Sequence, residues 1–127
     1  MNILAIDYGT KNIGLAINNG TEIAFPLRVV LNSEETIEEI KDIFDEEMID
    51  KIVLGMPTKM DRTKGVLAEK IKEFADSLEN SGLKVEFEDE FLSSEMTKKL
   101  MGDYKGKYEK DAIEAAVILQ SYLDKNV

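Results

Sequence analysis

The sequence predicts an α/β fold in which a mixed five-stranded sheet carries helices on both faces. Its N-terminal part reads as three short apolar strands in close succession, and the remainder alternates helix-like and strand-like segments. Strands joined by hairpins pair antiparallel, whereas strands reached through a helical crossover favour parallel pairing with a right-handed connection. One side of the sheet is therefore expected to be antiparallel and the other parallel.

The first three strands are expected at residues 2–7, 12–18 and 22–30. Asp7 shares one face of the first strand with Ile3 and Ala5. Both faces of this strand are mostly apolar, which is typical of a central strand covered on both sides. Residues 18–20, Asn-Asn-Gly, predict a hairpin because Asn and Gly tolerate a positive φ. Pro26 places the third strand at an edge, since proline has no N–H to donate to a neighbouring strand.

Helices are expected at residues 33–47, 65–80, 94–101 and 109–124, and two more strands at 51–55 and 83–89. Asn32 or Ser33 can cap the first helix, and its apolar stripe ends at Met48. Residues 81–82, Ser-Gly, end the second helix. Residues 102–107 read as a loop. This order of strands and helices is the ribonuclease H-like arrangement.

The composition limits the chemistry that is available. The chain has 127 residues, of which 43% are hydrophobic and 33% charged, and we expect a single domain over residues 1–127. We see no apolar run of about 18 residues and no secretory signal pattern, so we expect no membrane partner and a cytoplasmic location. With neither His nor Cys present, catalysis would have to use carboxylates, hydroxyls and lysines.

The net charge of −10 by itself argues against a nucleic-acid partner. The charge is unevenly distributed, however. Residues 34–50 hold nine acids and one lysine, whereas residues 98–110 hold five lysines and two acids. The acidic block is typical of solvated helix surface. The basic stretch fits either solubility or phosphate contact.

Three acidic residues stand at positions of special interest. Asp7 ends the first predicted strand, Glu90 closes the fifth, and Asp111 opens a last helix that is apolar on nearly every side. Each also has a structural explanation: a hydrogen-bonded buried Asp7, a surface Glu90, and an Asp111 that favours the positive end of the helix dipole. Carboxylates brought together repel one another unless a cation lies between them. Because Mg²⁺ and Mn²⁺ take oxygen ligands and assist phosphodiester cleavage, the three acids predict a Mg²⁺ or Mn²⁺ site.

Four segments carry a family resemblance, and they follow one another along essentially the whole chain. They are residues 6–16 (IDYGTKNIGLA), 53–61 (VLGMPTKMD) with Gly65 just after, 89–94 (DEFLSS) and 111–123. They resemble the motifs of the YqgF family of Holliday-junction-resolvase-like proteins, also called RuvX. The resemblance implies a ribonuclease H-like nuclease that processes the precursor of small-subunit (16S) ribosomal RNA, with Holliday junction resolution as an alternative.

Carried over residue by residue, the resemblance implies that Asp7, Glu90 and Asp111 are the catalytic and metal-binding acids. It also implies that Gly9, Thr10 and Lys11 approach a phosphate group. The chain departs from the family pattern where Asn12 and Phe91 replace the usual arginines, and where Lys110 replaces a small apolar residue. Lysines 98, 99, 105, 107 and 110 could compensate as point charges.

The leading hypothesis is therefore a metal-dependent endonuclease acting on structured RNA or branched DNA. We expect a monomer or weak homodimer that clamps the substrate backbone with Lys105, Lys107 and Lys110. A catalytically weak RNA- or ribosome-binding module is the alternative, motivated by the missing arginines and the acidic surface. Residues 7–10, Asp-Tyr-Gly-Thr, also resemble the first phosphate loop of actin-like and sugar-kinase ATPases. Those proteins close two such domains over ATP, and this chain has the length of one.

Overall fold

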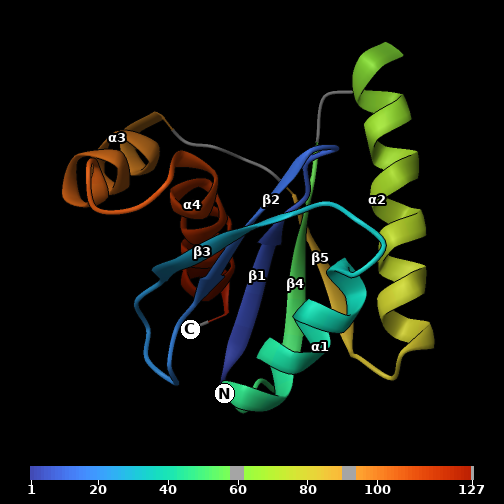
Figure 1. Cartoon of the computed structure of the whole chain (residues 1–127). Coiled ribbons are helices and arrows are strands. Elements are labelled where there is room, and N and C mark those ends of the chain that lie inside the picture. Colours follow the sequence, from blue (N-terminus) through green and yellow to red (C-terminus); the bar gives the residue numbers. More distant parts are fainter. Residues whose placement is uncertain (58–61, 90–93, 127) are drawn as a thin grey trace.

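The computed structural model describes residues 1–57, 62–89 and 94–126, and the strands within them form one five-stranded sheet (Figure 1). The strands are β1 (Ile3–Asp7), β2 (Asn12–Ile17), β3 (Phe25–Leu31), β4 (Lys51–Met56) and β5 (Val85–Asp89). Their order in the sheet is β3-β2-β1-β4-β5. The pairs β1–β2 and β2–β3 are antiparallel, and β1–β4 and β4–β5 are parallel. The predicted mixed sheet, with the first strand at its centre, is confirmed.

The helices within the described residues cover both faces of this sheet (Figure 1). They are α1 (Thr36–Glu46), α2 (Arg62–Asn80), α3 (Ser94–Tyr104) and α4 (Lys110–Lys125). Helices α1 and α2 pack on the face that carries Leu4 and Ile6. Helix α4 packs on the face that carries Ile3 and Ala5, and α3 lies against the outer side of α4. Each face buries its own apolar cluster, which explains why β1 is apolar on both sides. No helix in the described part of the chain is both long and apolar enough to cross a membrane.

Several predicted boundaries move, and side-chain hydrogen bonds explain two of them. Strand β3 begins at Phe25 rather than at residue 22, because Thr21 holds a local turn: its hydroxyl donates to Asn18 O and accepts from the Ile23 N–H. The expected cap of α1 is also wrong. Helix α1 starts after Glu35 without a side-chain cap. Asn32 donates instead to Gly9 O, and Ser33 Oγ accepts from the N–H of Glu35, before the helix begins.

Tertiary packing decides two further differences. The predicted loop 102–107 is helical as far as Tyr104, because Met101 and Tyr104 pack on the cluster that α3 shares with α4. Met48 lies beyond the end of α1 and does not belong to its apolar stripe: it is 77% exposed and has a φ of 53°. Ile49 is buried in its place, and its N–H donates to Phe44 O at 2.8 Å.

Pro26 lies on the edge strand β3, as the sequence predicts. The pairing of β3 with β2 is irregular next to it: Ala16 faces Pro26, whereas Leu15 faces Arg28. A bulge at this point accommodates the residue that has no backbone donor.

Candidate metal centre

Asp7 ends the central strand β1 on the face covered by α4. Strand residues alternate between faces, so the side chain of Asp7 follows Ile3 and Ala5, both buried against α4. The Asp7 carboxylate is half-buried, and its neighbour across the antiparallel pair is Gly14 of β2. The sequence placed Asp7 on this face correctly.

Gly14 allows the start of α4 to approach the sheet very closely. A Cβ atom built on Gly14 would lie 1.9 Å from Asp111 O and 3.0 Å from Ala112 N. Any side chain at this position would therefore collide with the helix backbone. Because Gly14 pairs directly with Asp7, the same close approach brings the first turn of α4 beside the Asp7 carboxylate.

Three carboxylates meet where β1 ends and α4 begins. They belong to Asp7, Asp111 and Glu114, and one oxygen from each lies within 4.8 Å of the others. All three side chains are half-buried, so solvent screens their mutual repulsion only in part. Carboxylate oxygens gathered in this way are the kind of ligand that Mg²⁺ and Mn²⁺ prefer. The residues present therefore fit a divalent metal ion.

The structure describes two of the three acids that the sequence singles out. Asp7 and Asp111 are brought together as expected, whereas Glu90 lies outside the described residues. Glu114 was missed by the sequence reasoning. It stands three residues after Asp111, and residues at this spacing lie on the same face of a helix. That spacing was the available signal for a third carboxylate.

The turn between β1 and β2 holds the predicted phosphate-contacting residues. Thr10 and Lys11 are exposed, and Gly9 is half-buried. Asn32, at the end of β3, ties this turn in place: its side-chain amide donates to Gly9 O and its backbone N–H donates to Lys11 O, each at 2.9 Å. A Cβ atom on Gly9 would lie 2.3 Å from Asn12 O, so the tight turn requires glycine there.

The predicted substrate-binding lysines around the start of α4 lie at the surface. Lys105, Lys107 and Lys110 are all exposed, and Lys110 approaches Glu114 with an Nζ–Oε1 distance of 3.9 Å. An i,i+4 pair whose lysine is exposed and whose Nζ–Oε1 distance is 3.9 Å adds little to stability. It does, however, place a cation directly beside the carboxylate cluster.

The opposite end of α4 is anchored by a separate polar group. Lys51 of β4, which is 9% exposed, forms an ion pair with Glu86 of β5 at 2.9 Å and a hydrogen bond with Tyr122 of α4. The Tyr122 hydroxyl donates to Glu86 at 2.6 Å. The hydrogen bonds from Tyr122 and then Lys51 lower the pKa of Glu86. Burial alone would lower the pKa of Lys51, but its hydrogen bonds outweigh that effect and raise the pKa.

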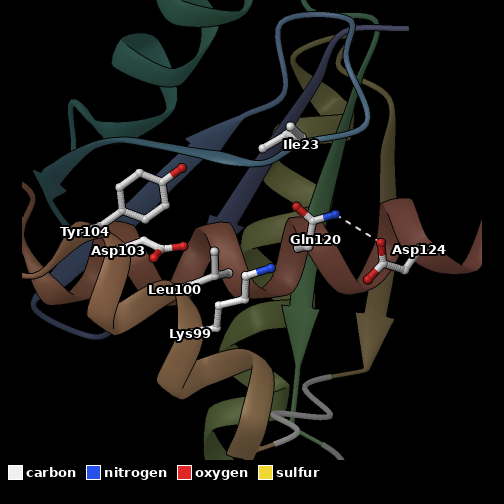
Figure 2. Close-up of a pocket in the computed structure, with 7 residues that line it drawn as sticks. All are labelled: Ile23, Lys99, Leu100, Asp103, Tyr104, Gln120 and Asp124. Atoms are coloured by element: carbon white, nitrogen blue, oxygen red, sulfur yellow. Dashed lines mark hydrogen bonds between the residues drawn. The ribbon is translucent and has the colours of Figure 1, made fainter.

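An open cleft of about 570 Å³ lies beside the C-terminal half of α4 (Figure 2). It is lined by Ile23, Lys99, Leu100, Asp103, Tyr104, Gln120 and Asp124. Among these residues, Gln120 is hydrogen-bonded to Asp124 at 3.0 Å and to the backbone of Glu22 and Ala24. None of the three clustered carboxylates lines this cleft, so it is separate from the candidate metal centre.

The strand order, the central position of β1 and the acidic cluster at its end define a ribonuclease H-like fold of the resolvase type. Solved structures show the same architecture. RuvC of T. thermophilus, in a complex with a Holliday junction substrate, superposes with a TM-score of 0.67 at 14% identity, covering 99% of this chain and 95% of that one. A fowlpox virus resolvase bound to Holliday junction DNA gives a TM-score of 0.57 at 18% identity, covering 100% and 99%. The ribonuclease H-like prediction is thus confirmed.

The chain belongs to the RuvX family. The family, described as "RuvX: Holliday junction resolvase", matches residues 1–125. A relative from Sulfurihydrogenibium sp. is 35% identical over 97% of this chain and 90% of its own length. A relative from Agathobacter rectalis is 35% identical over 98% of this chain and 95% of its own length. Both carry the name "Putative pre-16S rRNA nuclease". The predicted family is therefore confirmed.

Proposed function

We propose that this protein is a metal-dependent endonuclease that cleaves phosphodiester bonds in the precursor of 16S ribosomal RNA. The meeting of the Asp7, Asp111 and Glu114 carboxylates within 4.8 Å is the observation that carries this proposal. The names of the relatives supply the substrate, since they refer to pre-16S rRNA. Mg²⁺ or Mn²⁺ is the proposed cofactor.

In this proposal Asp7 and Asp111 are catalytic residues that hold the metal, and Glu114 joins them as a further ligand. Glu90 stays in the proposed site on the strength of the family resemblance. When bound, a divalent cation polarises the phosphoryl oxygens and acidifies a coordinated water. The role of the chain is to fix three carboxylates at the rigid junction of β1 and α4, so little reorganisation is needed when the substrate enters.

Polar and positive groups on the two elements that carry the cluster would hold the substrate backbone. Thr10 and Lys11 stand on the turn after β1, and Lys110 stands at the start of α4. Asn32 holds two carbonyls of that turn. Because the C=O and N–H of one trans peptide point in opposite directions, the Thr10 N–H is directed away from Asn32. We propose that this amide and the Thr10 hydroxyl donate to a phosphate oxygen, with Lys11 as a point charge.

A four-way DNA junction is the second candidate substrate. RuvC and the fowlpox virus resolvase share this fold and are bound to such junctions in their solved structures. A phosphate-directed site does not by itself distinguish RNA from DNA. The choice between the two substrates therefore needs a direct comparison.

The test is cleavage of a labelled 16S rRNA precursor fragment and of a four-way DNA junction, each with Mn²⁺, Mg²⁺ or EDTA. We expect cutting of the RNA that requires the metal and falls by at least about a hundredfold in Asp7→Asn. Asp76→Asn, an exposed residue of α2, is the matched surface control and should cut normally. Stronger cutting of the junction would reverse the substrate assignment. Metal-independent cutting, or an Asp7→Asn protein that cuts as well as its parent, would show that the proposed centre is wrong.

A further inference from the structure

Tyr108 is an exposed aromatic residue in the turn that joins α3 to α4. Its side chain is 43% exposed, and Lys105, Lys107 and Lys110 lie within three residues of it. All three lysines are exposed as well. Proteins bind single-stranded nucleic acids with this combination of an aromatic ring and lysines. The bases stack on the ring, and the lysines contact the phosphates of the nucleic-acid backbone.

The backbone of this turn holds Tyr108 in a defined position. The N–H groups of Lys107 and Tyr108 both donate to Tyr104 O, at 2.9 and 3.3 Å, and Lys105 forms an isolated bridge with Tyr108. Gly106 supplies the left-handed conformation that the turn requires, with φ 81°. Because hydrogen bonds already order the backbone of this turn, less conformational entropy is lost when a ligand binds to the Tyr108 ring.

Tyr104 supports the Tyr108 ring from the side of α3. The two ring centroids are 5.6 Å apart with an interplanar angle of 82°, an edge-to-face arrangement. Whichever of the two rings presents its edge to the other, Tyr104 covers at most one face of the Tyr108 ring. Tyr104 is itself fixed: it packs on the cluster of Leu100, Ile113 and Val117 at one end of the open cleft, and its hydroxyl donates to Ala24 O at 3.4 Å (Figure 2).

Tyr108 precedes Asp111 by three residues. Three residues span at most about 11 Å even when fully extended. That length equals about three stacked nucleotide steps of roughly 3.4 Å each. This limit applies to the Cα atoms, and the tyrosine ring reaches several Å further, so a base on the Tyr108 ring would belong to a nucleotide within a few positions of the phosphate held at the carboxylate cluster.

We propose that Tyr108 stacks on an unpaired base of the nucleic-acid substrate, while Lys105 and Lys107 contact the phosphates beside it. This inference rests on the proposed function and narrows its substrate class. A base within a continuous duplex has both faces covered by its neighbours. The site therefore selects a single-stranded or locally open segment next to the cleaved bond.

The test uses RNA that carries 2-aminopurine at successive positions of an unpaired segment. It is titrated with Asp7→Asn protein, which keeps the RNA intact. Stacking quenches the fluorescence of the probe at one position. Adding Tyr108→Ala should abolish the quenching and weaken binding about tenfold, or about 1.4 kcal/mol, whereas Tyr108→Phe should retain both. Tyr108→Leu, which keeps an apolar side chain in the turn, should behave like Tyr108→Ala.

Salt dependence separates stacking from charge. Tyr108→Ala should leave the slope of log affinity against log salt unchanged, whereas Lys107→Ala should reduce it by about one. Annealing a complementary strand to the unpaired segment should remove the difference between Tyr108→Ala and its parent. Equal losses on paired and unpaired RNA, quenching that survives Tyr108→Ala, or no RNA binding by the parent at low salt would each overturn the inference. If the quenching behaves as expected but the unsubstituted protein does not cleave, only the nuclease function fails.

Discussion

At the residue scale, the neighbours of Glu114 decide whether its charge stabilises or destabilises the folded protein. On the surface of a helix it would simply be solvated, but here it lies within 4.8 Å of Asp7 and Asp111. The nearby Lys110 compensates only weakly, because its side chain is 75% exposed. Repulsion among the three carboxylates should therefore destabilise the metal-free protein. A bound cation would offset this repulsion, because each carboxylate is attracted to the cation.

Replacing Glu114 by Gln tests this directly. Without metal, Glu114→Gln should raise the melting temperature, because one repelling charge is removed. With Mn²⁺ the melting temperature should rise less than in the parent, because the metal binds at least about tenfold more weakly. Thermal unfolding in EDTA and in Mn²⁺ measures both effects. The control is Glu69→Gln, an exposed residue of α2, which should change neither. A variant that is less stable in EDTA and equally stabilised by Mn²⁺ would exclude Glu114 from the site.

At the scale of secondary-structure elements, the site depends on how closely α4 lies against the sheet. Small residues line that contact: Ala5, Gly14 and Ala16 on the strands, and Ala115 and Ala116 on the helix. Gly14 leaves no room even for a Cβ atom, which would lie 1.9 Å from Asp111 O in the first turn of α4. Lys51, Glu86 and Tyr122 anchor the other end of the same helix. Helix α4 is thus fixed at both ends, and its first turn positions Asp111 and Glu114.

Gly14→Ala should push the first turn of α4 away from β2. A Cβ atom 1.9 Å from a backbone oxygen cannot be relieved by a side-chain rotation, so we expect a loss of about 1–3 kcal/mol in stability. We also expect weaker Mn²⁺ binding. Urea unfolding and metal titration by calorimetry provide the two measurements.

Gly102→Ala is the matched control for this substitution. Gly102 lies in α3, and apart from its chain neighbours and the backbone of its own helix no atom lies within 4 Å of the position that a Cβ would take there. Alanine should therefore stabilise the helix by about 0.5–1 kcal/mol. If Gly14→Ala were as stable as the parent and bound Mn²⁺ equally well, the close approach would not be what positions the carboxylates.

At the scale of the whole molecule, the acidic block of residues 34–50 and the lysine-rich residues 98–110 are associated with opposite faces of the sheet. The acidic α1 packs on one face, whereas α4 and the lysine-bearing turn before it lie on the other. Exposed charges further apart than about 8–10 Å are largely screened at physiological salt. A protein with a net charge of −10 can therefore present a locally basic surface beside its acidic cluster.

The pH dependence of global stability should reflect the anchor at the C-terminal end of α4. The pKa of Glu86 is lowered in the folded state, so its contribution is present above the ordinary value of 4.5 and is lost as the pH falls further. The pKa of Lys51 is raised, so its contribution is complete below 10.5 and is lost as the pH rises through the higher folded value. Stability should therefore decline at both extremes.

Glu86→Gln should remove part of the acidic decline. At pH 7 it should cost about 1 kcal/mol, a modest figure because the Glu86 side chain is 42% exposed while Lys51 stays buried. Urea unfolding between pH 3 and pH 7 measures both effects. Glu79→Gln, at an exposed position of α2, serves as the control. Parallel pH profiles for Glu86→Gln and the parent would contradict the assignment.

The sequence by itself determined the sheet and the family of this protein. Apolar alternation, the Asn-Gly turn and the edge proline are local signals, and each acts through the conformational preferences of a few adjacent residues. The face of Asp7 followed from the two-residue period of a strand. Even so, local signals wrongly predicted Asn32 as a helix cap and residues 102–107 as a loop throughout.

Only the tertiary structure decided which acids meet. Glu114 joins Asp7 across more than a hundred residues of sequence because Gly14 admits the backbone of α4, and no local pattern contains that contact. Asn32 likewise bonds to Gly9 rather than to its own helix, because the pairing of Leu31 with Asn12 brings Asn32 beside the turn that joins β1 to β2. Periodicity in a sequence specifies the elements, whereas the distances between side chains of different elements depend on how closely those elements pack.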